Sequence, residues 1–136
     1  MLVDQVMSKE VHCVAPDEKL LKLRDIFNEV KYHHLLVRED DRLLGLLSDR
    51  DIMRHLSPFL GTDQEKYKDR KLLDIQAKTI MSTEVISVEP STPIVCAAIL
   101  LLENNISCLP VVSEENSIAG ILTWKDLLEY YIYVKS

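Results

Sequence analysis

The sequence predicts an α/β protein made of two copies of one strand–helix–strand–strand–helix unit. The first observation is a seven-residue pattern that occurs twice, at 45–51 and 120–126. In each copy a glycine and two apolar residues precede a hydroxyl residue that can cap a helix, and an aspartate follows three positions later. The second observation is that the flanking residues repeat as well, which indicates an internal duplication.

The two copies keep an almost constant spacing. Val-Met-Ser at 6–8 matches Ile-Met-Ser at 80–82, 74 residues further on, whereas Gly45 and Gly120 are 75 residues apart. One residue was therefore inserted in the polar turn between 111 and 118. We expect a first repeat at 1–57, a partly helical linker at 58–79 and a second repeat at 80–136.

The first repeat contains three short apolar runs and two amphipathic stretches. The runs are bounded by proline or by a polar turn, which favours strands. The stretches carry apolar residues at helical spacing, and Asp17 is placed to cap the first of them. We therefore expect strands at 11–14, 35–37 and 43–47 and helices at 18–30 and 49–56.

The second repeat follows the same order, with one difference. Its expected elements are strands at 85–88, 109–112 and 118–122 and helices from Pro93 and from Lys125. The first of these helices begins with nine consecutive apolar residues, 94–102, whereas its counterpart at 18–30 keeps a polar face. A helix that is apolar on all sides must be covered on all sides, so we expect it to lie in a homodimer interface.

Composition and motifs exclude several classes of protein. Hydrophobic residues make up 47% and charged residues 28% of the 136, which is typical of a soluble globular domain, and no apolar run approaches the roughly 20 residues of a membrane-spanning helix. A net charge of −6 without a basic stripe argues against nucleic acid as a partner. The absence of a secretory signal and of CxxC spacing predicts a cytoplasmic protein with reduced thiols.

The sequence also lacks the signatures of catalysis and of metal binding. It has no nucleophile elbow, P-loop or HExxH, so we expect neither an enzyme nor a cofactor. Histidines and cysteines that could be considered as metal ligands do not have the spacing of a zinc site; they are His12, Cys13, His33, His34 and Cys108.

With both copies in view, the sequence resembles a cystathionine beta-synthase (CBS) domain pair, or Bateman module, of the stand-alone class. The resemblance rests on the pattern G-h-h-[ST]-x-x-D at the end of both copies and on Ile-Ser-Cys-Leu-Pro-Val at 106–111, and it covers about 6–128. It implies tandem repeats packed sheet to sheet around a pseudo-twofold axis. It also implies a regulatory module that binds an adenosine-containing ligand, such as AMP, ADP, ATP or S-adenosylmethionine, in clefts between the repeats.

The chemistry of the motif suits such a ligand. A helix N-terminus presents free N–H groups and a partial positive charge, which can hold a phosphate. Ser48 and Thr123 can cap their helices or reach that phosphate. Asp51 and Asp126 can stabilise the helix dipole, or their two oxygens can take both hydroxyls of a ribose, which is the role that the resemblance favours.

The resemblance implies two clefts, each with residues from both repeats. One joins Ser48 and Asp51 with residues of the second repeat, namely Thr92, Ala97, Ile106, Ser107, Cys108 and Pro110. The other joins Thr123 and Asp126 with Tyr32, His33, His34 and Leu36. This second cleft departs from the family pattern, because Leu36 replaces the proline and Glu18 replaces Thr92. A carboxylate that faces a phosphate is unfavourable, so this cleft is either empty or takes a different ligand with the help of the histidines.

A different class of function stays open at this point. The chain can also be a dimerisation or scaffold module whose ligand clefts are vestigial. The two aspartates distinguish these hypotheses, because a scaffold needs them only for a fraction of a kcal/mol of helix stability, about 0.3–1 kcal/mol each.

Overall fold

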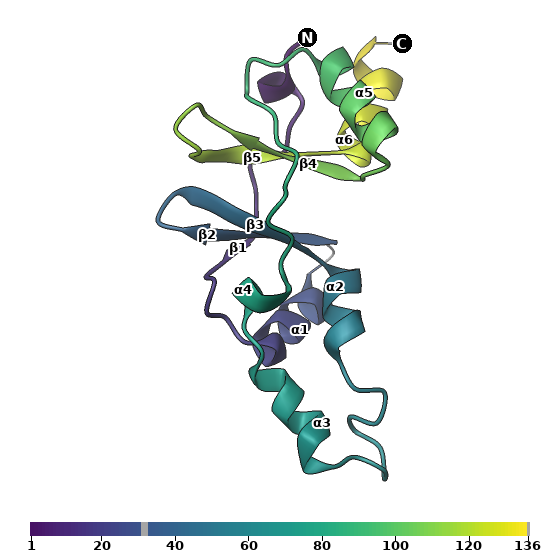
Figure 1. Ribbon diagram of the computed structural model, residues 1–136. Coiled ribbons are helices and arrows are strands. Elements are labelled where there is room, and N and C mark those ends of the chain that lie inside the picture. Colours follow the sequence, from purple (N-terminus) through teal and green to yellow (C-terminus); the bar gives the residue numbers. More distant parts are fainter. Residues whose placement is uncertain (31–32, 136) are drawn as a thin grey trace. The chain divides into compact units, whose positions relative to one another are not determined.

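The computed structural model describes residues 1–30 and 33–135, and within them it has two small sheets and six α-helices (Figure 1). The prediction of an α/β fold is confirmed. The chain forms two compact units, and neither is one continuous stretch. Unit 1 comprises Met1–Val11, Asp41–Leu43 and Val85–Ser136, and unit 2 comprises His12–Asp40 and Leu44–Glu84. The repeat boundaries near 57 and 79 stay a prediction about the duplication.

Unit 2 is organised around a three-stranded sheet in the order β1-β2-β3. Its strands are β1 (Cys13–Val14), β2 (His34–Glu39) and β3 (Arg42–Ser48), the last of which begins in unit 1. Its helices are α1 (Leu20–Glu29), α2 (Asp49–His55), α3 (Tyr67–Lys71) and α4 (Ala77–Ile80), with a 3-10 turn, η2 (Leu72–Asp74), between the last two.

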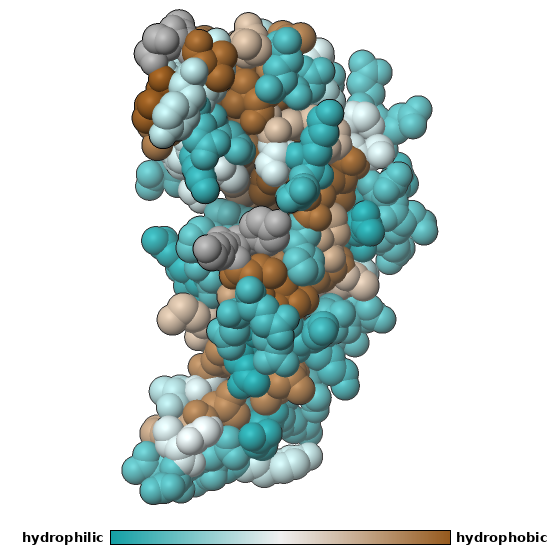
Figure 2. Space-filling view, turned by 180° about the vertical axis from the view of Figure 1, so that it is seen from behind, coloured by the Kyte–Doolittle hydropathy of each residue, from teal (hydrophilic) through white to brown (hydrophobic). Residues whose placement is uncertain are grey.

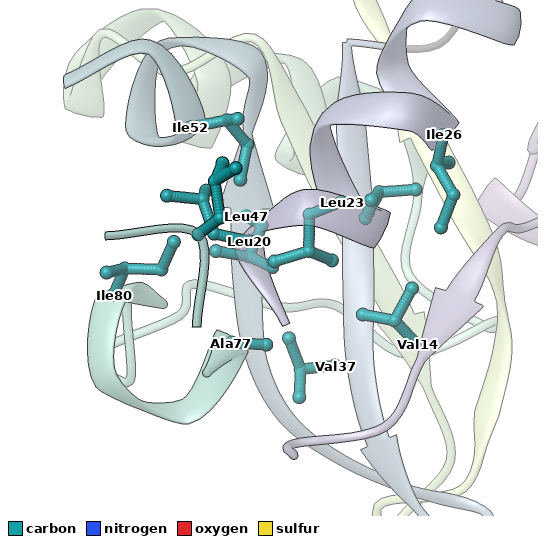
Figure 3. Packing of buried hydrophobic residues seen from close by; sticks show 11 residues of the cluster. Val14, Leu20, Leu23, Ile26, Val37, Leu47, Ile52, Ala77 and Ile80 are labelled. Carbon is teal, nitrogen blue, oxygen red and sulfur yellow. The ribbon is translucent and has the colours of Figure 1, made fainter. Parts of the chain in front are cut away.

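Apolar side chains from α1 pack onto the sheet and onto α4 to form the core of unit 2 (Figure 3). Leu20, Leu23 and Ile26 follow one another at three-residue spacing on one face of α1, which is the face that an amphipathic helix buries. The same cluster contains Val14, Val37, Leu47, Ile52, Leu73, Ala77 and Ile80.

The start of α1 differs from the prediction. Asp17 is not its cap: the helix begins at Leu20, and the N-cap residue, Lys19, makes no side-chain capping bond. The Leu20 N–H instead donates to the carbonyl of Ile75 at 2.8 Å. A backbone partner from the segment before α4 thus satisfies a donor that a side-chain cap usually serves.

The segment between the repeats is held by a buried carboxylate. Asp69 in α3 is only 5% exposed and accepts a hydrogen bond from Ser57 Oγ and one from the Lys66 N–H, each at 2.7 Å. Both bonds favour the charged form and hold the pKa of Asp69 below its ordinary value. The linker is therefore an ordered part of unit 2, held in place by hydrogen bonds.

Unit 1 is organised around an antiparallel hairpin of β4 (Cys108–Val112) and β5 (Ile118–Thr123). Its α-helices are α5 (Ile94–Asn104) and α6 (Trp124–Glu129), with a 3-10 turn, η1 (Val3–Gln5), and a terminal π-helical segment, η3 (Tyr130–Lys135). A second apolar cluster lies here, and its members include Val3, Val88, Ile94, Ala97, Leu101, Leu109, Val111, Leu122 and Leu127.

The expected strand at 85–88 is wrong, and two prolines explain the difference. Val88 alone bridges to Val111: its N–H donates to the Pro110 carbonyl at 3.0 Å, and its carbonyl accepts from Val112 N–H at 2.9 Å. In a parallel ladder the next donors would be the nitrogens of Pro110 and Pro90, which carry no hydrogen. In unit 2, Leu36 occupies the position that corresponds to Pro110. Its N–H donates to the His12 carbonyl at 3.0 Å, and the short strand β1 therefore pairs with β2.

The Met-Ser segment near the start of each repeat crosses the strand that carries the other repeat's glycine. Ser8 and Ile121 exchange two backbone hydrogen bonds at 2.9 Å in unit 1, and Ser82 and Leu46 do the same at 2.9 and 3.0 Å in unit 2. A Cβ at Gly120 would lie 2.6 Å from the Ser8 carbonyl oxygen. The close crossing, and not a turn, requires this glycine.

Candidate ligand-binding site

Two short helices begin with the same capping arrangement, one in each unit. At the start of α2, the Asp51 N–H donates to Ser48 Oγ at 3.2 Å, and the Ser48 N–H donates to Asp51 Oδ2 at 2.8 Å. At the start of α6, the corresponding bonds between Asp126 and Thr123 measure 3.4 and 2.9 Å. The predicted caps are confirmed, and the ligand-binding role of these four residues stays a prediction.

Each capping carboxylate has one oxygen left for another donor. The capping bonds end on Oδ2 of Asp51 and of Asp126, and the Thr123 hydroxyl also donates to the latter at 3.1 Å. Among the residues that the structure describes, no donor is bonded to Oδ1 of either carboxylate. Both side chains are half-buried at the N-terminal end of a helix. Each can therefore accept a further hydroxyl group without giving up its cap.

Asp126 is partly withdrawn from solvent. Burial raises the pKa of Asp126 above its ordinary value of 3.8, while the hydrogen bonds from the Thr123 backbone and hydroxyl act in the opposite direction. Desolvation disfavours the charged form, so this carboxylate gains from any donor that replaces lost water. A ribose offers two such hydroxyl donors side by side.

In unit 2, both described histidines of the predicted second cleft lie beside the start of α2. The Asp49 N–H donates to the His33 carbonyl at 3.1 Å, and His33 Nδ1 hydrogen-bonds Asp49 Oδ2 at 3.0 Å. That side-chain bond lowers the pKa of Asp49. Burial lowers the pKa of His34, against the nearby charges of Asp49 and Asp51, so the neutral imidazole is favoured there.

In unit 1, the segment expected to read the base lies beside the start of α6. The Trp124 N–H donates to the Ser107 carbonyl at 3.3 Å, and the indole Nε1–H donates to the Ile106 carbonyl at 3.1 Å. Ser107 is exposed and Ile106 half-buried. These two residues thus lie at the surface next to the Thr123 and Asp126 cap.

The other predicted ligand residues of the second repeat are more deeply placed. Ala97, Cys108 and Pro110 are buried, and Ala97 belongs to the apolar cluster of unit 1. Burial raises the pKa of the Cys108 thiol to about 12, so it is protonated at neutral pH. The Thr92 hydroxyl accepts a hydrogen bond from the Glu89 N–H at 3.1 Å.

The structure brings the predicted residues together within each unit. His33 and His34 lie with Ser48 and Asp51, and the 106–108 segment lies with Thr123 and Asp126. The combination of residues from both repeats in one cleft stays a prediction. Tyr32, which the resemblance assigns to the second cleft, lies outside the described residues.

Sequence reasoning did not single out Trp124 or Asp49 as site residues. Each is the first residue of its helix, directly after the capping hydroxyl, and each bonds through its side chain to the segment that precedes or starts the neighbouring strand. Their shared position in the duplicated pattern was the available signal, although the pattern itself leaves that position open.

Two features are absent from the described part of the chain, a cluster of metal ligands and a membrane-spanning helix. Residues 1–30 and 33–135 contain no group of three or more histidine, cysteine or acidic side chains placed to hold a metal ion. Over the same residues, every helix is too short or too polar to cross a bilayer.

Comparison with known proteins identifies the family. The CBS domain model matches residues 3–58 and 77–133. A CBS domain-containing protein from Dictyostelium discoideum is 32% identical over 136 residues, which cover 98% of this chain and 93% of the relative. The chain belongs to the CBS domain family, as its sequence pattern predicted.

Solved structures agree in fold. The protein CBSX2, solved in complex with AMP, has a TM-score of 0.83 and 26% identity, and the match covers 99% of this chain and 98% of that one. A protein from Methanocaldococcus jannaschii, described as a putative archaeal homologue of γ-AMPK, has the same TM-score and 26% identity. Here the match covers 96% of this chain but 47% of the other.

Proposed function

We propose that the chain is a non-catalytic regulatory module of the cytoplasm that binds an adenosine-containing ligand at its two helix caps. The observation that carries this proposal is the doubled arrangement of Asp51 and Asp126. Each carboxylate closes a capping box and keeps an oxygen for a further donor at the positive end of a helix. A nucleotide has hydroxyls for the carboxylate and a phosphate for the helix end.

The comparison with CBSX2 supports the class of ligand. That protein was solved with AMP and matches this chain over nearly its full length at 26% identity. In the proposed mechanism, ligand in a cleft between the repeats favours one angle between them, and a partner protein that distinguishes the angles reads the change.

A thermal-shift screen tests the ligand class. The purified chain is heated with AMP, ADP, ATP, NAD or S-adenosylmethionine, and GTP serves as the control. A ligand that binds only the folded state at 100 times its dissociation constant adds about 2.7 kcal/mol, which raises Tm by several degrees in a chain of this size. If no adenosyl compound shifts Tm and calorimetry confirms the absence of binding, the scaffold hypothesis replaces the sensor.

A matched pair of variants tests the carboxylate. Asp51→Asn removes one acceptor oxygen and the charge but keeps an oxygen for the Ser48 N–H, so the cap is retained. Asp63→Asn makes the same change at an exposed position outside the site. Calorimetry with AMP should show at least a tenfold weaker Kd for Asp51→Asn than for Asp63→Asn. Equal affinities would remove Asp51 from the ribose site.

We also propose that the module is a homodimer through α5. This helix buries Ile94, Ala97 and Leu101 and leaves Val95, Ile99 and Leu102 exposed by 56%, 45% and 64%. The exposed three fall at spacings of four and three residues and so form one apolar stripe. More apolar side chains are exposed in the C-terminal part of unit 1 (Figure 2), namely Leu128, Ile132 and Val134. A second copy is the partner that covers such a surface by symmetry.

A further inference from the structure

Trp124, the only tryptophan of the chain, bonds to the segment that is expected to read the base. Its backbone N–H donates to the Ser107 carbonyl at 3.3 Å, and its indole Nε1–H donates to the Ile106 carbonyl at 3.1 Å. The side chain is 37% exposed and follows directly on the Thr123 cap. One residue thus engages two consecutive carbonyls beside the proposed ligand site.

In the first repeat, the position equivalent to Trp124 is Asp49, and its side chain bonds differently. The Asp49 N–H donates to the His33 carbonyl at 3.1 Å, in the same way as the Trp124 N–H donates to Ser107. The Asp49 side chain, however, is an acceptor and bonds the imidazole of His33 at 3.0 Å. A carboxylate cannot donate to a carbonyl. The indole bond is therefore a property of the second repeat.

The Ile106 carbonyl, which accepts the indole hydrogen bond, can also accept one from an amine on a base. Adenine differs from unsubstituted purine by an exocyclic NH2 group, and a backbone carbonyl is an acceptor for such a group. While the indole is bonded to Ile106, an incoming amine must share that oxygen or displace the indole. The partly exposed position of Trp124 leaves the side chain room to turn outward.

We propose that Trp124 is a gate that determines specificity at this site: its indole N–H holds the Ile106 carbonyl in the free protein and yields it to the 6-amino group of adenine. This inference rests on the proposed function. Displacement of the indole costs one hydrogen bond, so the gate weakens binding of amine-bearing ligands by about three- to tenfold. Ligands that lack the amine do not open it.

Intrinsic fluorescence of the wild-type chain gives the first test, because its emission comes from one indole. Titration with AMP should change the emission, with a midpoint that equals the Kd from calorimetry. Purine riboside 5′-monophosphate, which has the same sugar and phosphate but no amine, should change it little.

The variant Trp124→Phe gives the second test, since it keeps an aromatic ring and removes the donor. AMP should bind this variant about three- to tenfold more tightly than the wild type, while the affinity for purine riboside 5′-monophosphate stays within twofold. Tyr133→Phe, an exposed aromatic substitution in η3, is the control and should change neither affinity. Circular dichroism checks that each variant is folded.

The outcomes separate this inference from the proposed function. If AMP binds by calorimetry with no change in emission and with equal affinity for wild type and Trp124→Phe, the gate is wrong and the sensor stands. If AMP binds Trp124→Phe but not the wild type, the gate is supported. If AMP binds neither protein, the inference falls together with AMP as the ligand.

Discussion

Asp126 shows how one carboxylate can couple helix capping, burial and ligand chemistry. Its raised pKa means that the folded chain holds the proton more tightly than the unfolded chain does. Stability from this group is therefore present below the unfolded pKa near 3.8 and is lost as the pH rises through the folded pKa. At neutral pH the charged carboxylate is therefore kept at some cost to stability.

Asp126→Asn tests this coupling. The amide is neutral at every pH and still offers an oxygen to the Thr123 N–H. Because the wild-type carboxyl is neutralised only in acid, the Tm of the variant relative to wild type should be higher at pH 7 than at pH 4. Thermal melts at both pH values measure this difference. A difference in Tm that is the same at both pH values would contradict the assigned cause of the shift.

The residues of the caps were predictable from sequence, and the gate was not. A capping box lies within four residues, so local pattern is enough to find Ser48 with Asp51 and Thr123 with Asp126. The bond from Trp124 to Ile106 joins residues 18 apart through the fold of a strand pair. No local rule places an indole on that carbonyl.

At the scale of elements, the errors have backbone causes. The strand expected at 85–88 shrinks to one bridge because Pro110 and Pro90 lack donors, and the Asp17 cap fails because Ile75 supplies the partner for the first turn of α1. In both cases a segment distant in sequence decides whether a hydrogen bond forms. The hairpin of β4 and β5 was predicted well, since adjacent strands joined by a short turn depend on local sequence.

The close strand crossings at Gly45 in β3 and Gly120 in β5 predict that a side chain at either position destabilises the fold. A methyl group at Gly120 meets the Ser8 carbonyl at 2.6 Å, and one at Gly45 meets the Ser82 carbonyl at 2.8 Å and Met81 Sδ at 2.5 Å. Backbone atoms cannot yield without a shift of the crossing segment. Gly120→Ala and Gly45→Ala should therefore each lower the free energy of unfolding by about 1–3 kcal/mol, as measured by urea denaturation.

Gly61→Ala is the contrast for this pair. A Cβ added at Gly61 would meet open space, and only the φ of +78° disfavours a side chain there. Its substitution should cost about 1 kcal/mol through backbone conformation alone. If Gly120→Ala costs no more than Gly61→Ala, the strand crossing is looser than the contact distances indicate.

At the scale of the whole molecule, the apolar stripe of α5 distinguishes the two repeats. Residues of α1 that match Val95, Ile99 and Leu102 in the duplication are Leu21, Asp25 and Asn28. Only the second repeat thus carries the full apolar stripe. This asymmetry is visible in sequence, whereas the partner that covers the stripe is not.

Ile99→Glu tests the proposed dimer, and Leu21→Glu, at an apolar position of α1 with nearly the same exposure, is its control. A charge in the centre of a buried apolar interface is strongly unfavourable, so Ile99→Glu should give monomer by light scattering at micromolar concentration, while Leu21→Glu should not.

The rate of cysteine alkylation tests the same interface independently. Exposed Cys96 on α5 should react faster in the Ile99→Glu monomer than in the wild-type dimer. Cys108, whose pKa burial raises to about 12, should stay unreactive in both variants. A wild-type chain that is monomeric under these conditions would overturn the proposal.

The pairing of Ser8 with Ile121, a residue of the other repeat, has a consequence for synthesis on the ribosome. All of unit 2 lies between residues 12 and 84, so its contacts can close while the rest of the chain is still being made. Ser8 must wait for Ile121, more than a hundred residues later, before it finds its partner in unit 1. Residues 1–11 are thus made before unit 2 but are placed only after β5 has been made. Unit 1 can therefore complete its contacts only after those of unit 2 have had time to form.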